Sequence, residues 1–141
     1  MTTTPEKILY TAHASATAGR SGLTRTDDAM VVHLLAIPTG MGGNGKGSNP
    51  EQLFAAGYAA CFGSAVEFVA RRDHVNIGEV KVDAEVGIGP TGTGFGLAVT
   101  LTAHIANVDA ATADDLIAKA HQACPYSNAT RGNIPVEIKR G

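Results

Sequence analysis

Residues 49–72 read NPEQLFAAGYAACFGSAVEFVARR, and they contain the most apolar long stretch of this 141-residue chain. Asn49 is a favourable N-cap, Pro50 suits the first helical position, and Glu51 suits the positive end of a helix dipole. The segment therefore predicts one long helix that ends at its arginine pair. Because Ala, Gly and Ser leave this helix almost no polar face, we expect it in a core or between subunits.

Alternation of apolar and polar residues predicts strands on both sides of this helix. Residues 8–17 predict a strand with one buried face, and residues 30–37 a more buried one. Residues 80–88 and 95–105 predict a hairpin whose loop is the Pro- and Gly-rich stretch 90–94. A second helix is predicted after Asp109, and the last strand contains Ile134, Val136 and Ile138.

The second predicted helix has an apolar stripe that ends at Cys124, and Pro125 is expected to stop it. The order of elements indicates an α+β protein with mostly antiparallel sheets around a long central apolar helix. No linker or repeat divides the sequence, so residues 1–141 are expected to form a single domain.

Composition narrows the function classes. Apolar residues make up 44% and charged residues 17% of the chain, which is typical of a folded globular protein. A net charge of −2 without a basic run gives nucleic-acid binding little support. The N-terminal residues do not resemble a secretory signal, and Glu67 interrupts the apolar stretch. We therefore expect a cytoplasmic protein with reduced thiols and no membrane span.

Three motifs suggest chemistry that their context does not support. Residues 40–46, GMGGNGK, match a phosphate-binding loop, but Gly47 replaces the required Ser or Thr and the helix begins too late. Residues 87–92 have dinucleotide-binding spacing but precede a strand. His121 and Cys124 are spaced to share a metal ion, yet no second pair accompanies them, so we expect no metal site.

The two cysteines remain as candidates for a functional site. Taken singly, Cys61 and Cys124 are each explained as small buried hydrophobes. Both fall on helix faces that should point inward, so the two side chains could meet. Their surroundings are also more specific than a core requires: NPEQLFAAGYAACF at 49–62 and CPYSNATRGN at 124–133.

These two segments resemble the organic hydroperoxide resistance (Ohr) proteins of the superfamily that includes osmotically inducible protein C. The resemblance extends over the whole chain and includes AGRSG at 18–22 and GFGL at 94–97. It implies an OsmC/Ohr-like intertwined homodimer. It also implies a thiol peroxidase that reduces organic hydroperoxides to alcohols, with no bound cofactor. The implied reductant is a dihydrolipoyl group on a lipoylated protein.

The resemblance implies that Cys61 is the peroxidatic cysteine and Cys124 the resolving one, with Arg20 and Glu51 as polar partners of Cys61. A free cysteine with a pKa near 8.5 is only a few per cent thiolate at neutral pH, and an apolar helix raises that pKa further. A nearby cation is therefore needed to lower the pKa of Cys61, and Arg20 is the candidate. Glu51 would hold its guanidinium in place.

Helix geometry limits how these residues combine. Glu51 and Cys61 are separated by roughly 15 Å at 1.5 Å per residue, so they cannot both touch one peroxide within one chain. Either a neighbouring subunit supplies Glu51 or Arg20 makes a long reach, and we favour the first. Leu53, Phe54 and Met41 are expected to cover the organic tail of the substrate.

Two other classes of protein remain open. One is a redox-sensing or ligand-binding module without turnover, and the other is a structural dimer with inert cysteines.

Overall fold

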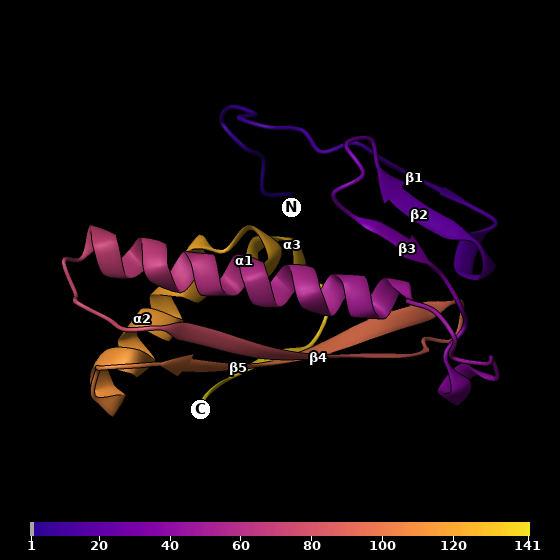
Figure 1. Cartoon of the computed structure of the whole chain (residues 1–141). Helices are drawn as coiled ribbons and strands as arrows, with labels where there is room; N and C mark the ends of the chain where they lie inside the picture. The colour runs from indigo at the N-terminus through magenta and orange to yellow at the C-terminus, as the bar shows by residue number, and fades with distance from the viewer. Residues whose placement is uncertain (1) are drawn as a thin grey trace. The chain divides into compact units, whose positions relative to one another are not determined.

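The computed structural model describes residues 2–141. They form two compact units whose boundary falls between Leu53 and Phe54, within the long helix α1 (Pro50–Arg72). The first unit contains three short strands, and the second contains a sheet with three helical segments (Figure 1). This arrangement is the predicted α+β class.

The sheet of the second unit has the order β4-β5-β6. Strands β4 (Val80–Pro90) and β5 (Phe95–Ile105) pair antiparallel, and their turn falls where the Gly-rich stretch predicted it. Strand β6 (Val136–Arg140) pairs with β5 in parallel, because the chain between them crosses over through helices.

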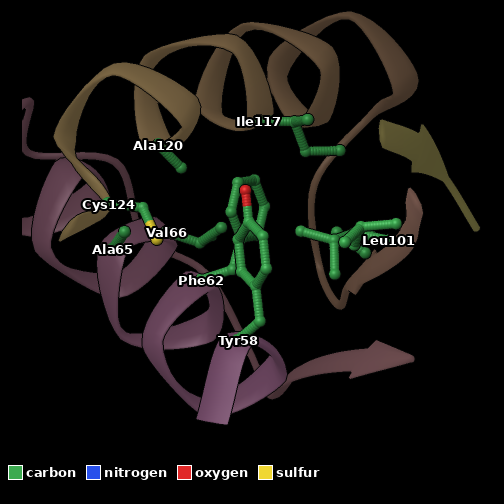
Figure 2. Packing of buried hydrophobic residues seen from close by; sticks show 10 residues of the cluster. Tyr58, Phe62, Ala65, Val66, Leu101, Ile117, Ala120 and Cys124 are labelled. Carbon is green, nitrogen blue, oxygen red and sulfur yellow. The ribbon is translucent and has the colours of Figure 1, made fainter. Parts of the chain in front are cut away.

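The core of the second unit lies between this sheet and the helices on one of its faces. Figure 2 shows side chains of α1, α2 (Ala110–Ala123) and β5 converging on the ring of Tyr58. Every second residue of β5 from Val99 to Ala103 is buried, as the alternation predicted. The buried cluster consists of Tyr58, Phe62, Ala65, Val66, Val99, Leu101, Ala103, Ile117, Ala120 and Cys124.

Helix α1 is the one helix within residues 2–141 that is long and apolar enough to cross a membrane, a property that core helices share. Its residues Tyr58, Phe62, Ala65, Val66, Val69 and Ala70 are buried. Asn49 caps it as predicted, by accepting a 2.8 Å hydrogen bond from the Gln52 amide. The Gln52 side chain accepts one from the Asn49 amide in return, which completes a capping box that the sequence analysis had not identified.

The region around Pro125 differs from the prediction. Asp109 caps α2 as expected, and the helix ends at Ala123. Pro125 does not only end α2, because it is also the first residue of a further helix, α3 (Pro125–Thr130). A proline lacks an amide hydrogen and so fits the first helical turn, where that hydrogen would have no partner.

The first unit is less buried than the sequence predicted. Its antiparallel strands are β1 (Ala14–Thr17), β2 (Leu23–Thr26) and β3 (Val32–Leu34), with 3-10 turns at Gly19–Ser21 and Thr39–Met41. The predicted strand over 8–17 is shorter, β2 was not predicted, and β3 is exposed. Within residues 2–53 only Leu35 and Asn49 are buried, since no second layer of this unit covers the small sheet.

The Gly-rich loop at 38–47 is closed by its own backbone. The amides of Gly43 and Gly45 donate to the carbonyls of Pro38 and Ile37, and the Lys46 amide donates to the Asn44 side chain. These amides are therefore not free to bind a phosphate, which agrees with the interpretation of this motif as a surface loop.

The core predicts a large stability effect at its centre. Replacing Leu101, which is fully buried, by alanine should lower the free energy of unfolding by about 2–5 kcal/mol. Thr93→Ala, in the exposed turn between β4 and β5, should change it by less than about 0.5 kcal/mol. Urea denaturation measures both variants, and equal stability losses would show that Leu101 is not at the centre of the core.

Candidate active site: two cysteines and an arginine–glutamate pair

The structure brings the two cysteines together. The Cys124 thiol donates a hydrogen bond to the Cys61 sulfur, with 3.6 Å between the two Sγ atoms. Both are free thiols; Cys61 is partly buried and Cys124 is fully buried. A disulfide needs about 2.05 Å between the sulfurs, so a small movement would join them.

Cys124 is held where α2 meets α3. Its amide donates to the Ala120 carbonyl at the end of α2, at 2.8 Å. Its sulfur also acts as the cap of α3, accepting from the Ser127 amide at 3.5 Å. Because one residue ends one helix and begins the next, its side chain has little freedom. The sequence signal was the Cys-Pro pair, which had been interpreted only as a helix stop.

The surroundings of Cys61 in the second unit favour its neutral form. Burial raises the pKa of the Cys61 thiol, and the adjacent Cys124 raises it further, whereas a hydrogen bond with the Tyr126 backbone lowers it. The net direction is upward. Activation of this sulfur at neutral pH therefore requires a cation that these three groups do not supply.

Arg20 and Glu51 form a second pair, in the first unit. The guanidinium donates two hydrogen bonds to the carboxylate, Nη1 to Oε2 at 2.8 Å and Nη2 to Oε1 at 2.6 Å. The pair raises the pKa of Arg20 and lowers that of Glu51. A bidentate contact of this kind fixes the plane of the guanidinium.

This pairing refines the expectation about neighbouring subunits. The sequence analysis expected Glu51 to hold the Arg20 guanidinium and favoured a Glu51 supplied by a neighbouring subunit. In the structure the two residues pair within one chain. Any site that uses the Arg20 guanidinium therefore also contains the Glu51 of the same chain.

An apolar cavity of about 450 Å³ lies beside α3 in the second unit. It is lined by Phe54, Leu97, Pro125, Tyr126, Ala129, Thr130, Asn133 and Ile134. Of the three residues expected to cover an organic tail, Phe54 lines it, whereas Leu53 and Met41 belong to the first unit. The lining residues of α3 were missed because that segment had not been predicted as a helix: Pro125, Tyr126, Ala129 and Thr130.

Tyr126 connects this cavity to the cysteines. Its ring centroid lies 6.0 Å from that of Phe54 and 5.6 Å from that of Tyr58. Gly57 leaves room for it, because a Cβ atom there would lie 2.6 Å from the Tyr126 hydroxyl. Gly57 is four residues before Cys61, so both lie on the same face of α1. Tyr126, which lines the cavity, thus lies against the face of α1 that carries Cys61, and its backbone forms a hydrogen bond with that sulfur.

Within residues 2–141, no group of three or more His, Cys, Asp or Glu side chains is placed to share an ion. His121 is partly buried with its Nδ1 atom shielded, and burial together with Arg131 lowers its pKa.

Comparison with known proteins identifies the class. The model of the OsmC-like protein family matches residues 43–139, and the chain belongs to that family. Within it, the chain is 52% identical to an organic hydroperoxide resistance protein of Xanthomonas axonopodis pv. citri, over 95% of this chain and 96% of that one. It is 39% identical to the organic hydroperoxide resistance protein OhrB of Bacillus subtilis, over 93% and 97% of the two chains.

Solved structures agree. The crystal structure of an organic hydroperoxide resistance protein from Elizabethkingia anophelis superposes with a TM-score of 0.91 at 50% identity, covering 96% of this chain and 98% of that one. The predicted resemblance to the Ohr proteins and the predicted fold class are confirmed.

The arginine–glutamate pair predicts a pH-dependent stability. The pKa of Glu51 is lower in the folded than in the unfolded chain, so its contribution is present above the unfolded pKa and lost as pH falls through the folded pKa. Glu51→Gln should lower the free energy of unfolding by about 1 kcal/mol at pH 7. The difference in this free energy between the variant and the original protein should shrink below about pH 4.5.

Denaturation curves between neutral and acidic pH measure this difference. Glu67→Gln, at an exposed position of the same helix, is the matched control and should show a smaller difference. A Glu51→Gln effect that stays constant down to the acid limit would contradict the role of the ion pair in stability.

Proposed function

We propose that this chain is a thiol-dependent peroxidase that reduces organic hydroperoxides to alcohols through a Cys61 sulfenic acid and a Cys61–Cys124 disulfide. The family supports the coarser statement, because its members are named for organic hydroperoxide resistance. The observation that carries the mechanism is the 3.6 Å approach of the two sulfurs. Two thiols in contact, one accessible and one buried, can pass from thiol to disulfide without a large movement of the chain.

The difference in burial assigns the two roles. Cys61 is partly accessible to solvent, whereas Cys124 has no exposed surface. A hydroperoxide reaches Cys61 first, so Cys61 is the attacking nucleophile and Cys124 the resolving thiol. The proposal requires Cys61 as a thiolate, because the thiolate is the reactive form.

In the first step the Cys61 thiolate attacks the oxygen of the hydroperoxide distal to the organic group. An S–O bond forms, the O–O bond breaks, and the organic oxygen leaves with the electron pair and takes up a proton to become the alcohol. Cys61 is left as a sulfenic acid. Arg20, fixed by Glu51, stabilises the thiolate and the charge that develops on the departing oxygen.

In the second step the Cys124 sulfur attacks the sulfenic sulfur, the hydroxyl leaves as water, and the disulfide forms. An external dithiol then reduces it by exchange and becomes a disulfide itself. We propose a dihydrolipoyl group of a lipoylated protein as this donor, on the basis of the family resemblance. The proposed cycle uses no bound cofactor or metal.

The apolar cavity supports an organic substrate. Its volume of about 450 Å³ and its aromatic and aliphatic lining suit a hydrocarbon group rather than a second polar one. Hydrogen peroxide has no organic group that could bind to this apolar lining. We therefore propose that bulky organic hydroperoxides are preferred over hydrogen peroxide.

We also propose that the working form is a homodimer in the cytoplasm. The first unit exposes large apolar side chains that a second copy would cover: Ile8, Leu9, Tyr10, Met30, Val31, Val32 and Leu34. A reducing compartment suits free thiols that must be regenerated.

Stoichiometric oxidation tests the proposed function. One equivalent of cumene hydroperoxide should remove both thiols and yield a Cys61–Cys124 disulfide, seen by mass spectrometry. Cys61→Ser should consume no peroxide, whereas Cys124→Ser should turn over once and then drift to sulfinic acid. A fully active Cys61→Ser protein would refute the proposal.

The same preparation separates the other classes of protein. Thiols that do not react in the folded state would indicate a structural dimer. Oxidation without turnover, when dihydrolipoamide, glutathione and thioredoxin are each supplied, would indicate a sensor.

Arg20 has its own test. Arg20→Ala should raise the pKa of Cys61 and slow the attack on peroxide at pH 7 by about ten- to a hundredfold, with recovery as pH rises. Thiolate absorbance against pH and single-turnover rates measure the two effects. Arg25→Ala, which removes a guanidinium from an exposed position of β2, is the control. A titration and rate equal to those of the original protein would remove Arg20 from the site.

A further inference from the structure

A buried hydroxyl group joins the same two helical segments as the cysteines. Tyr58 of α1 is fully buried, and its Oη atom lies 2.8 Å from Ser127 Oγ and 3.2 Å from Thr130 Oγ1 of α3. Ser127 is fully buried and Thr130 nearly so. Figure 2 shows the Tyr58 ring inside the core of the second unit, with Cys124 in the same cluster. Neither the peroxide reaction nor the disulfide step described above uses this hydroxyl group.

The spacing of these residues is matched on the two segments. Tyr58 and Cys61 are three residues apart on α1, and their partners Ser127 and Cys124 are also three residues apart. Residues three apart on a helix lie on one face. The Ser127 amide, which donates to the Cys124 sulfur, closes a ring of contacts that contains both sulfurs.

We propose that Tyr58 is a positioning residue for the disulfide step. Its hydroxyl holds Ser127, and with it the start of α3, in the register that puts the Cys124 sulfur against Cys61. The inference deepens the proposed function, on which it rests. It assigns to Tyr58 a part in resolving the sulfenic acid and no part in the attack on peroxide.

The local chain cannot fix this register by itself. Helix α3 has six residues, too few to be stable without tertiary contacts. The Tyr58 hydroxyl supplies such a contact at a fully buried site, where unpaired polar groups are costly. If the Tyr58 hydroxyl is removed, Ser127 Oγ loses its hydrogen-bond partner on α1. The Cys124 side chain is then held less firmly against Cys61 in the reduced protein.

The chemical consequence is a change in how the sulfenic acid is consumed. Cys124 attacks it and releases water, or a second hydroperoxide oxidises it to the sulfinic acid and is itself reduced to the alcohol. The second route needs no Cys124. A loosened Cys124 therefore shifts the products toward sulfinic acid and leaves the first oxidation unchanged.

A dithiol equilibrium tests the positioning without any peroxide. The full-length protein is equilibrated with mixtures of reduced and oxidised dithiothreitol, and the fraction of Cys61–Cys124 disulfide is measured after acid quench. Tyr58→Phe should lower the equilibrium constant for disulfide formation about three- to tenfold, the scale of one lost hydrogen bond. Ser127→Ala should lower this equilibrium constant by the same factor. The double variant should lower it no further than either single variant.

Two controls separate positioning from general loss of stability. Thr93→Ala removes a hydroxyl from the exposed turn between β4 and β5 and should leave the equilibrium constant unchanged. Leu101→Ala weakens the same core from β5 without removing a hydrogen bond to α3, and should also leave the equilibrium constant unchanged. An unchanged constant in Tyr58→Phe, or an equal fall in Leu101→Ala, would overturn the proposal.

A peroxide titration provides the second readout. The fraction of Cys61 sulfinic acid at a given excess of cumene hydroperoxide should rise about three- to tenfold in Tyr58→Phe, while the rate of first thiol loss matches that of the original protein. A slower first step with unchanged sulfinic acid would overturn the assignment. If the original protein does not react with peroxide, the proposed function fails, and the dithiol equilibrium still decides the role of Tyr58.

Discussion

The contact between the sulfurs of Cys61 and Cys124 is the constraint around which the second unit is organised. It requires a helix face without bulk, and α1 supplies one, with Gly57 leaving room for Tyr126 one turn before Cys61. It also requires that a residue 63 positions away return to that face. The crossover from β5 to β6 through α2 and α3 accomplishes this, with Cys124 at the joint between the two helices.

The burial that keeps the two sulfurs together also opposes the ionisation of Cys61. An apolar setting raises the pKa of the Cys61 thiol, whereas the thiolate is the reactive form of a cysteine. The polar groups suited to offset this effect, Arg20 and Glu51, lie in the other compact unit and are already paired with each other. The pair proposed to activate Cys61 thus belongs to a different compact unit from the sulfur.

Sequence reasoning succeeded where a local rule determines structure. The cap at Asn49, the hairpin around residues 90–94 and the buried alternation of β5 follow from residue types within a few positions of one another. It failed where the outcome depends on what packs against a segment. Residues 8–17 alternate as a half-buried strand should, yet only Ala14–Thr17 form one and their side chains are exposed. Pro125 was interpreted as a stop, although the same residue type also begins helices.

The sequence analysis expected both pairings of the candidate site, but not the apolar wall beside it or the contacts that hold Cys124. Cys61, Cys124, Arg20 and Glu51 came from family resemblance, and the structure groups them into two pairs. Neither the matched spacing of Tyr58 and Ser127 nor the cavity wall from α3 could be inferred, because both depend on a helix that the sequence analysis had not identified.

The position of the two sulfurs also bears on heat resistance. A covalent link between residues 61 and 124 would close a loop containing most of the second unit, and the lost freedom of the unfolded chain would be worth about 4 kcal/mol. The oxidised form of the protein would then have the higher free energy of unfolding, and each reduction of the disulfide would lower it again. In the proposed cycle the protein would therefore resist unfolding best when reductant is scarce and the disulfide persists.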